Sequence, residues 1–132
     1  MTLNNTILVV DDEPDVLELL ELDLSSRGFA VIKADCGEDA IKKAKAYLPD
    51  IILMDVLMPD MNGGQAVRLL QADPHTQNIP TLFLTAAMTR EDKNWGITVD
   101  QSFYPALAKP FEISELLTAI DTLLSRTKKV GS

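Results

Sequence analysis

Short runs of apolar residues alternate along the chain with longer stretches in which apolar residues recur every three or four positions. The first run, residues 6–10, is β-branched and ends at two aspartates, which is typical of a buried strand. In the next stretch Val16, Leu20 and Leu24 share one side of a helix, and Gly28 provides a C-terminal stop. The repeated pattern predicts strands at 6–10, 30–34, 51–54, 81–84 and 106–108, helices that begin at 15, 37, 65 and 113, the last running to about 127, and a short helix within 88–104.

Alternating strands and helices of this kind predict an α/β fold with a flavodoxin-like, doubly wound (βα)5 architecture. Five parallel strands are expected in the order 2-1-3-4-5, with right-handed crossovers and helices on both faces of the sheet. Residues 51–54 are apolar on both sides, which suits a central strand. We expect a single domain over 1–132, with its core at about 6–127 and a frayed tail at 128–132.

The composition restricts the functions that the chain can have. Twelve Lys and Arg against twenty Asp and Glu give its 132 residues a net charge of −8 at pH 7. A field of this sign repels phosphate polymers and anionic lipids, so direct binding to nucleic acid or membranes is not expected. The single cysteine, Cys36, excludes an internal disulfide, and no segment resembles a signal peptide or a membrane span. We therefore expect a cytoplasmic protein, and we interpret its one histidine, His75, as a solvated loop residue.

The polar residues that could carry chemistry lie where the predicted strands end. Asp11 and Asp12 follow the first strand, Asp55 the third, Thr85 the fourth and Lys109 the fifth. Ligands of open α/β sheets bind at this edge, beside the point where the strand order reverses. Two carboxylates 4 Å apart repel each other by about 1 kcal/mol in water and by about 4 kcal/mol at an effective dielectric of 20. A hard cation such as Mg²⁺ would relieve this repulsion, and Lys109 could pair with a phosphoryl oxygen.

Each of these residues also has an ordinary structural explanation, but their coincidence at four strand ends favours a functional site. Aspartates favour helix starts, threonine favours strands, and a lysine is often a solvated charge. A nucleotide-binding domain is disfavoured, because the turn after the first strand is Asp-Asp-Glu-Pro rather than glycine-rich and no Walker lysine is present. A haloacid-dehalogenase-type phosphatase is disfavoured as well. Its second aspartate would stand two residues after the nucleophile, whereas Asp11 and Asp12 are adjacent.

Four motifs occur in order along nearly the whole chain: ILVVDDE at 7–13, DVLMPDMNG at 55–63, Thr85-Ala86 and Lys109-Pro110-Phe111. Together they resemble the receiver domain of two-component response regulators, which are similar in fold to the chemotaxis regulators. The resemblance implies a phosphoprotein of a phosphorelay rather than an enzyme with a separate substrate. The implied partners are a histidine kinase or a histidine phosphotransfer protein, with an unknown downstream target. The chain itself is expected to be a monomer or a weak dimer.

By this resemblance Asp55 is the phosphoacceptor, which takes its phosphoryl group from a phosphohistidine of the partner. The resemblance also implies a Mg²⁺ site. Asp12 and Asp55 would bind the ion through their side chains and Leu57 through its backbone carbonyl, while Asp11 would act mainly through a bound water. The domain would thus catalyse its own phosphorylation.

The remaining implied roles concern the phosphoryl group once it is attached. Thr85 would hydrogen-bond a phosphoryl oxygen, and Lys109 would pair with it. The bond between Lys109 and Pro110 is expected to be cis, since X-Pro is the common site of cis peptide bonds. Dephosphorylation is expected to be slow, because Leu57 and Ala87 flank the path of the attacking water and neither can orient it.

The chain departs from the family just before the lysine, where the family's frequent Gly-Ala is missing and Pro105 is present. The family usually carries Tyr or Phe three residues before the lysine, where this chain has Ala106, with Phe103 and Tyr104 just upstream. We therefore expect that phosphorylation is retained, and that the surface of the fourth helix, the fifth strand and the last helix signals in a different way. The alternative is a degenerate receiver that serves as a protein-binding scaffold without phosphorylation.

Overall fold

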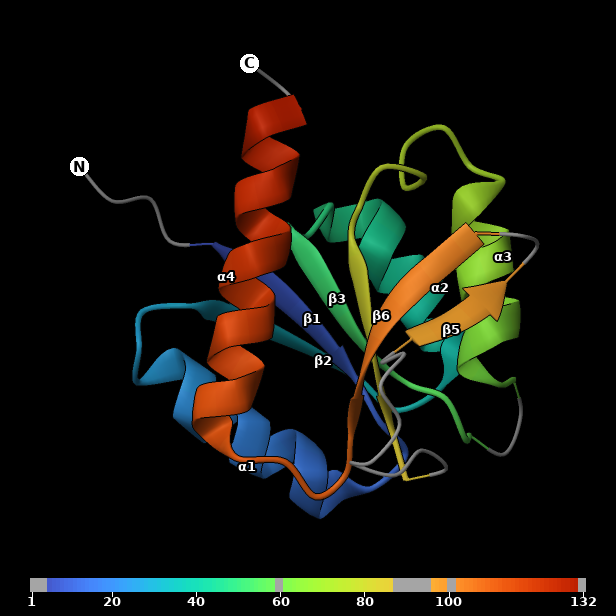
Figure 1. Ribbon diagram of the computed structural model, residues 1–132. Helices are drawn as coiled ribbons and strands as arrows, with labels where there is room; N and C mark the ends of the chain where they lie inside the picture. The colour runs from blue at the N-terminus through green and yellow to red at the C-terminus, as the bar shows by residue number, and fades with distance from the viewer. Residues whose placement is uncertain (1–4, 59–60, 87–95, 100–101, 131–132) are drawn as a thin grey trace.

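The computed structural model describes residues 5–58, 61–86, 96–99 and 102–130 (Figure 1). No helix among these residues combines the length and the apolar character needed to cross a membrane. The elements, in chain order, are β1 Thr6–Val10, α1 Pro14–Ser25, β2 Ala30–Ala34, α2 Gly37–Tyr47, β3 Ile51–Asp55, α3 Gly63–Gln71, β4 Thr81–Thr85, β5 Gly96–Val99, β6 Ser102–Ala108 and α4 Ile113–Val130.

The strands form one sheet in the order β2-β1-β3-β4-β6-β5. The first five strands in this order are parallel, which confirms the predicted order 2-1-3-4-5 and the flavodoxin-like architecture. In Figure 1, α1 and α4 lie on the near face of the sheet, and α2 and α3 lie on the far face. The sheet is therefore the middle of three layers.

Helices on both faces explain why the central strands β1 and β3 contain continuous apolar runs, at 7–10 and 51–54. Along β1, Ile7 and Val9 pack with leucines of α1 and α4, whereas Leu8 and Val10 pack with residues of α2 and α3. All four side chains are fully buried. Burying one such side chain stabilises the fold by about 1.5–3 kcal/mol relative to leaving it exposed. The buried sheet thus fixes the positions of the loops at the carboxyl ends of its strands.

Local capping fixes where three helices start. Pro14 occupies the first turn of α1, where its missing N–H has no partner to lose. Cys36 caps α2, and its Sγ accepts a hydrogen bond from the backbone N–H of Asp39 at 3.4 Å. Asn62 and Gln65 form a capping box at the start of α3. These caps set the directions of the chain after β1, β2 and β3.

The main difference from the sequence prediction is a sixth strand. β5 pairs with the first half of β6 in antiparallel fashion, with Ile97 opposite Tyr104. The described part of 88–104 is therefore strand where the pattern predicts a short helix, and 87–95 lie outside the described residues. β-branched and aromatic residues favour strands, which accounts for the difference. Pro105 is tolerated because the parallel ladder with β4 begins only at the next residue.

Two boundaries also differ from the prediction. β6 begins at Ser102, four residues before the predicted start at 106, because its first half pairs with β5 instead of β4. α4 continues to Val130, so the predicted frayed tail is helical in its first three residues, 128–130. Gly28, the predicted helix stop, follows the end of α1 with a φ of 96°, in the left-handed region that glycine adopts without steric cost.

Candidate functional site

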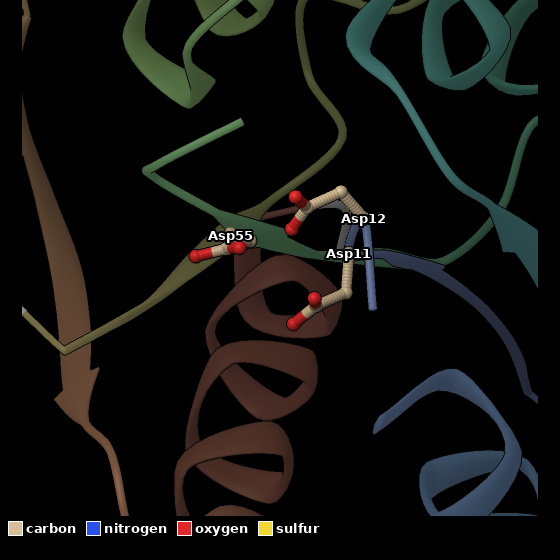
Figure 2. A group of neighbouring side chains, drawn as sticks. All are labelled: Asp11, Asp12 and Asp55. Carbon is tan, nitrogen blue, oxygen red and sulfur yellow. The ribbon is translucent and has the colours of Figure 1, made fainter. Parts of the chain in front are cut away.

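The carboxyl ends of the parallel strands bring the predicted residues together. Asp11 follows β1, Asp55 ends β3, Thr85 ends β4 and Lys109 follows β6. The backbone N–H of Lys109 donates to the carbonyl oxygen of Thr85 at 2.9 Å, which joins the last two of these ends. Figure 2 shows the side chains of Asp11, Asp12 and Asp55 gathered at this edge.

Asp11 is fully buried and is held by two hydrogen bonds. Its Oδ1 accepts from the backbone N–H of Glu13 at 2.9 Å, and its Oδ2 accepts from Nζ of Lys109 at 2.7 Å. The Lys109 side chain is only 18% exposed, so this ion pair is partly shielded from water and correspondingly stronger. Asp11 therefore fixes the position of the lysine ammonium.

Asp55 is also a buried carboxylate, but its contacts with positive charge and N–H donors are longer than those of Asp11. Its Oδ1 lies 3.7 Å from Nζ of Lys109 and accepts a long hydrogen bond of 3.4 Å from the backbone N–H of Leu57. Burial raises the pKa of Asp55, and the negative charge of Asp11 raises it further. Lys109 and the Leu57 N–H lower this pKa but do not cancel the rise. The positive charge of Lys109 therefore only partly offsets the burial of the Asp55 carboxylate and its repulsion by Asp11.

Lys109 keeps its charge despite its burial. Desolvation lowers the pKa of Lys109, but the hydrogen bond and charge of Asp11, together with the charge of Asp55, raise this pKa on balance. The side chain is an ammonium at neutral pH. This fixed positive charge beside a buried carboxylate can stabilise an anionic group that binds next to Asp55.

The three aspartates suit a small, hard cation. Asp11, Asp12 and Asp55 each offer an oxygen, and these oxygens lie within 4.8 Å of one another. Asp12 is exposed, so the group is open to solvent on one side, as an ion that keeps several waters requires. The donor chemistry fits Mg²⁺, because carboxylate and carbonyl oxygens are its usual protein ligands.

The structure distinguishes the two aromatic residues that lie before Ala106. Tyr104 is partly buried and its ring meets that of Phe83 edge-on, with the ring centroids 5.8 Å apart and the planes at 85°. Phe103, on the opposite face of β6, is 62% exposed. Ala106 itself is buried beside Phe83. Tyr104, and not Phe103, is the aromatic residue that faces inward.

Two contributions to the site depend on backbone geometry, which the sequence does not specify directly. The first is the Glu13 N–H, which orients Asp11. The second is Gly63, where an added Cβ would lie 2.7 Å from the carbonyl oxygen of Asp55. Glycine is needed there because α3 starts directly against the segment that carries the Asp55 carboxylate. The turn-like composition of 59–64 is the only pattern that hints at this close approach.

The other predictions at single positions have clear outcomes. The Lys109–Pro110 peptide bond is cis, as predicted. His75 has an 80% exposed side chain and contacts Asp73 in a surface turn, which confirms that it is a solvated loop residue. Ala87 lies outside the described residues.

An apolar groove of about 510 Å³ opens beside Lys109, between α1 and the segment 109–113. A second groove, of about 470 Å³, lies over β2 between α1 and α2 and is lined mainly by charged residues. The first groove adjoins the site directly. Its lining residues are Val16, Leu19, Leu20, Asp23, Ala86, Lys109, Pro110, Phe111 and Ile113.

Comparisons with known proteins agree with one another. The sequence model described as "Response regulator receiver domain" matches residues 7–121. Protein PilH of Pseudomonas aeruginosa is 38% identical over 119 residues, which make up 90% of this chain and 97% of PilH. The chain also matches transcriptional regulatory proteins, of whose length it spans about half.

Solved structures show the same likeness. Chemotaxis protein CheY4 of Vibrio cholerae superimposes with a TM-score of 0.80 at 29% identity, over 92% of this chain and 99% of that one. The receiver domain of sensor histidine kinase PA1611 of Pseudomonas aeruginosa has a TM-score of 0.81 at 28% identity, over 93% and 99% of the two chains. That structure contains a magnesium ion coordinated in its active site cleft.

Proposed function

Because this chain belongs to the receiver domains of two-component response regulators, we propose that it is a phosphoacceptor switch in which Asp55 takes a phosphoryl group from a phosphohistidine. The observation that supports this best is the Asp55 carboxylate, 3.7 Å from the Lys109 ammonium and beside two further carboxylates. The ammonium offsets the repulsion between the acceptor and the incoming anion. The donor is a histidine kinase or a histidine phosphotransfer protein.

The transfer needs position and charge rather than a general base. A carboxylate oxygen of Asp55 attacks phosphorus in line with the P–N bond of the donor phosphohistidine. A P–O bond to Asp55 forms as the P–N bond breaks, and its electron pair goes to the imidazole nitrogen, which takes a proton from solvent. A carboxylate attacks in its ionised form and needs no base to remove a proton during the transfer, so no histidine of this chain is required.

Lys109 and Thr85 serve the transferred group in this proposal. Lys109 pairs with one phosphoryl oxygen from the position that Asp11 gives it. Thr85 is buried at the end of β4, and its hydroxyl donates to a second phosphoryl oxygen. Both contacts strengthen as charge accumulates on the phosphoryl oxygens, and they therefore favour transfer.

The same carboxylates hold magnesium. Asp12 and Asp55 bind through their side chains and Leu57 through its backbone carbonyl. Asp11 acts mainly through a bound water, as the resemblance to the family implies, while its own oxygens accept from the Glu13 N–H and from Nζ of Lys109. Magnesium, when bound, neutralises the carboxylates and the phosphoryl oxygens.

A direct test is phosphorylation by a small donor. The wild-type chain incubated with acetyl phosphate and Mg²⁺ is expected to gain the mass of one phosphoryl group, measured on the intact protein. Asp55→Asn is expected to gain none, and EDTA is expected to slow the wild-type reaction strongly. If the wild type gains nothing under conditions that phosphorylate another receiver domain, the chain is a scaffold and the proposal is wrong.

Slow dephosphorylation is part of the proposal. Leu57 stands two residues after Asp55, is 59% exposed and has no polar atom to orient a water. Leu57→Asn is expected to shorten the lifetime of the phosphoryl group by about tenfold, because its amide can position the attacking water. The matched control is Leu69→Asn, since Leu69 is 49% exposed on α3. Equal lifetimes for the two variants, followed by intact mass over time, would contradict this prediction.

We further propose a cytoplasmic location, because the donor histidine of a kinase is phosphorylated by ATP, which is available in the cytoplasm. The chain acts there as a monomer or weak dimer that signals through protein contacts. Its net charge of −8 opposes direct contact with nucleic acid.

A further inference from the structure

The hairpin of β5 and β6 rests on the elements that flank Asp55. Phe83 is fully buried on β4, two residues before Thr85 and on the same face of the sheet. Its ring meets the Tyr104 ring of β6 in the edge-to-face arrangement that aromatic pairs prefer. Tyr104 in turn pairs with Ile97 of β5. One aromatic contact therefore links the strand that ends at the site with the hairpin.

Phe83 also packs against the start of α3. A Cβ added at Gly63 would lie 3.0 Å from Cε1 of Phe83 and 2.7 Å from the carbonyl oxygen of Asp55. The N–H of Gly63 donates to the carbonyl oxygen of Val56 at 2.9 Å. The acceptor segment, the first turn of α3 and the Phe83 ring are thus in direct contact, and close-packed groups of this kind move together.

The hairpin makes a second contact with the same turn of α3. Val99 of β5 is buried, and its Cγ2 lies 3.7 Å from the position of a Cβ added at Gly64. β6 therefore reaches the turn through Phe83, and β5 reaches it directly. Both contacts lie next to the segment that carries Asp55.

Ala106 makes the aromatic contact possible. It lies opposite Phe83 in the parallel ladder between β4 and β6. A large side chain there would occupy the space beside the Phe83 ring. With alanine, the ring is accessible to Tyr104, its diagonal neighbour on the same face of β6.

We propose that Tyr104 latches the hairpin onto the unphosphorylated site and that phosphorylation of Asp55 releases the hairpin. This rests on the proposed function. A phosphoryl group brings about two negative charges and three strong acceptor oxygens into the space beside Thr85 and the first turn of α3. As Thr85 and Lys109 turn to these oxygens, the end of β4 and the turn of α3 shift. Phe83, packed on both, then loses its fit to Tyr104.

Linkage fixes the direction of the effect. A contact made only in the empty site opposes any ligand that requires the released arrangement, so removal of that contact must tighten the ligand. The gain cannot exceed the strength of the aromatic contact, which corresponds to about two- to tenfold in affinity. Tyr104 is a positioning residue in this scheme, because it acts through Phe83.

The test uses the full chain with Mg²⁺ and beryllofluoride, which mimics the phosphoryl group on a carboxylate. Affinity is measured by titration, and hydrogen exchange is measured at the backbone amides of β5 and β6. In the wild type, beryllofluoride is expected to accelerate exchange at Ile97 and Val99. Tyr104→Ala is expected to bind beryllofluoride two- to tenfold more tightly, and its hairpin amides are expected to exchange fast already without the ligand.

Two variants separate the latch from a general loss of structure. Phe103→Ala removes the exposed ring on the opposite face of the same strand and is expected to behave as wild type. Tyr104→Phe keeps the ring and with it the contact with Phe83, so it is expected to bind beryllofluoride less tightly than Tyr104→Ala. Unchanged or weaker affinity in Tyr104→Ala, or hairpin exchange in the wild type that ignores bound beryllofluoride, would overturn the latch. No binding of beryllofluoride by the wild type would instead overturn the proposed function, and the latch with it.

Discussion

At the scale of single residues, the acceptor role proposed for Asp55 conflicts with the stability of the fold. Burial and the neighbouring charge of Asp11 raise the pKa of Asp55 above its usual value. Without a metal ion, the ionised carboxylate that the proposed transfer requires is therefore also a source of instability. A carboxylate selected for stability alone would have a partner closer than the 3.7 Å to Lys109.

Asp55→Asn is expected to raise the free energy of unfolding in EDTA at pH 7 by roughly 1 kcal/mol, because it removes the cost of burying the charge and the repulsion from the adjacent carboxylates. The sign follows from the raised folded pKa. The free energy of unfolding of the wild type falls as the pH rises from the pKa of an unfolded aspartate, about 3.9, through the raised pKa of folded Asp55. Below this pH range, wild type and Asp55→Asn should therefore become similar in stability. Urea denaturation across the pH range measures the difference.

Magnesium should reverse this order of stability. It is expected to stabilise the wild type more than Asp55→Asn, because the variant lacks one of the proposed ligands. Asp121→Asn, at an exposed position of α4, is the control and should change little under either condition. If Asp55→Asn is less stable than wild type in EDTA at pH 7, the electrostatic explanation given for Asp55 is wrong.

At the scale of elements, the strands and helices with two buried faces or one clear apolar stripe are predictable from the sequence. β1 and β3 contain the uninterrupted apolar runs 7–10 and 51–54, and their assignment needs no tertiary information. The site follows from them, because parallel strands place Asp11 and Asp55 at one edge. Topology alone therefore predicts which residues meet there.

The hairpin is not predictable in the same way. Gly96 and Pro105 interrupt its pattern, and its strands are stabilised by contacts with residues far along the chain. Tyr104 packs on Phe83, and Val99 lies against the first turn of α3. The same holds within the site. That Tyr104 faces inward while Phe103 faces solvent depends on the register with β5 and not on either residue's type.

The close contact between the start of α3 and the end of β3 leads to a prediction about Gly63. Gly63→Ala is expected to lower the free energy of unfolding by about 1–3 kcal/mol, because the added Cβ would lie 2.7 Å from the backbone oxygen of Asp55, which cannot turn aside. The variant should also accept a phosphoryl group more slowly, since the acceptor segment must shift. Urea denaturation and intact mass measure the two effects.

Gly64→Ala is the matched control in the same turn. The nearest atom to its Cβ would be the side-chain Oδ1 of Asn62 at 3.3 Å, and Val99 lies further away at 3.7 Å. Alanine inside a helix is favoured over glycine by about 0.5–1 kcal/mol, so this variant should be as stable as wild type or slightly more stable. Similar losses of stability in both variants would show that the contact with Asp55 is not what requires Gly63.

At the scale of the whole molecule, the groove beside Lys109 should matter for a protein phosphodonor but not for a small-molecule phosphodonor such as acetyl phosphate. A protein that presents a phosphohistidine to Asp55 must cover the surface around the site, whereas acetyl phosphate needs only the site itself. The groove runs from Lys109 along α1, where Leu19 is 62% exposed and lies on its wall. An exposed leucine next to a buried ammonium offers a donor protein an apolar contact close to the reacting atoms.

Leu19→Glu is therefore expected to slow transfer from a phosphorylated histidine phosphotransfer protein by about tenfold, the effect of losing one strong apolar contact. Phosphorylation by acetyl phosphate should be unchanged, because the substitution does not touch Asp55 or the metal ligands. Leu69→Glu places the same charge on an exposed leucine of α3, on the other face of the sheet, and should affect neither reaction. Both rates are measured by intact mass over time. If Leu19→Glu slows both donors equally, the substitution acts on the site and the groove is not where the donor protein docks.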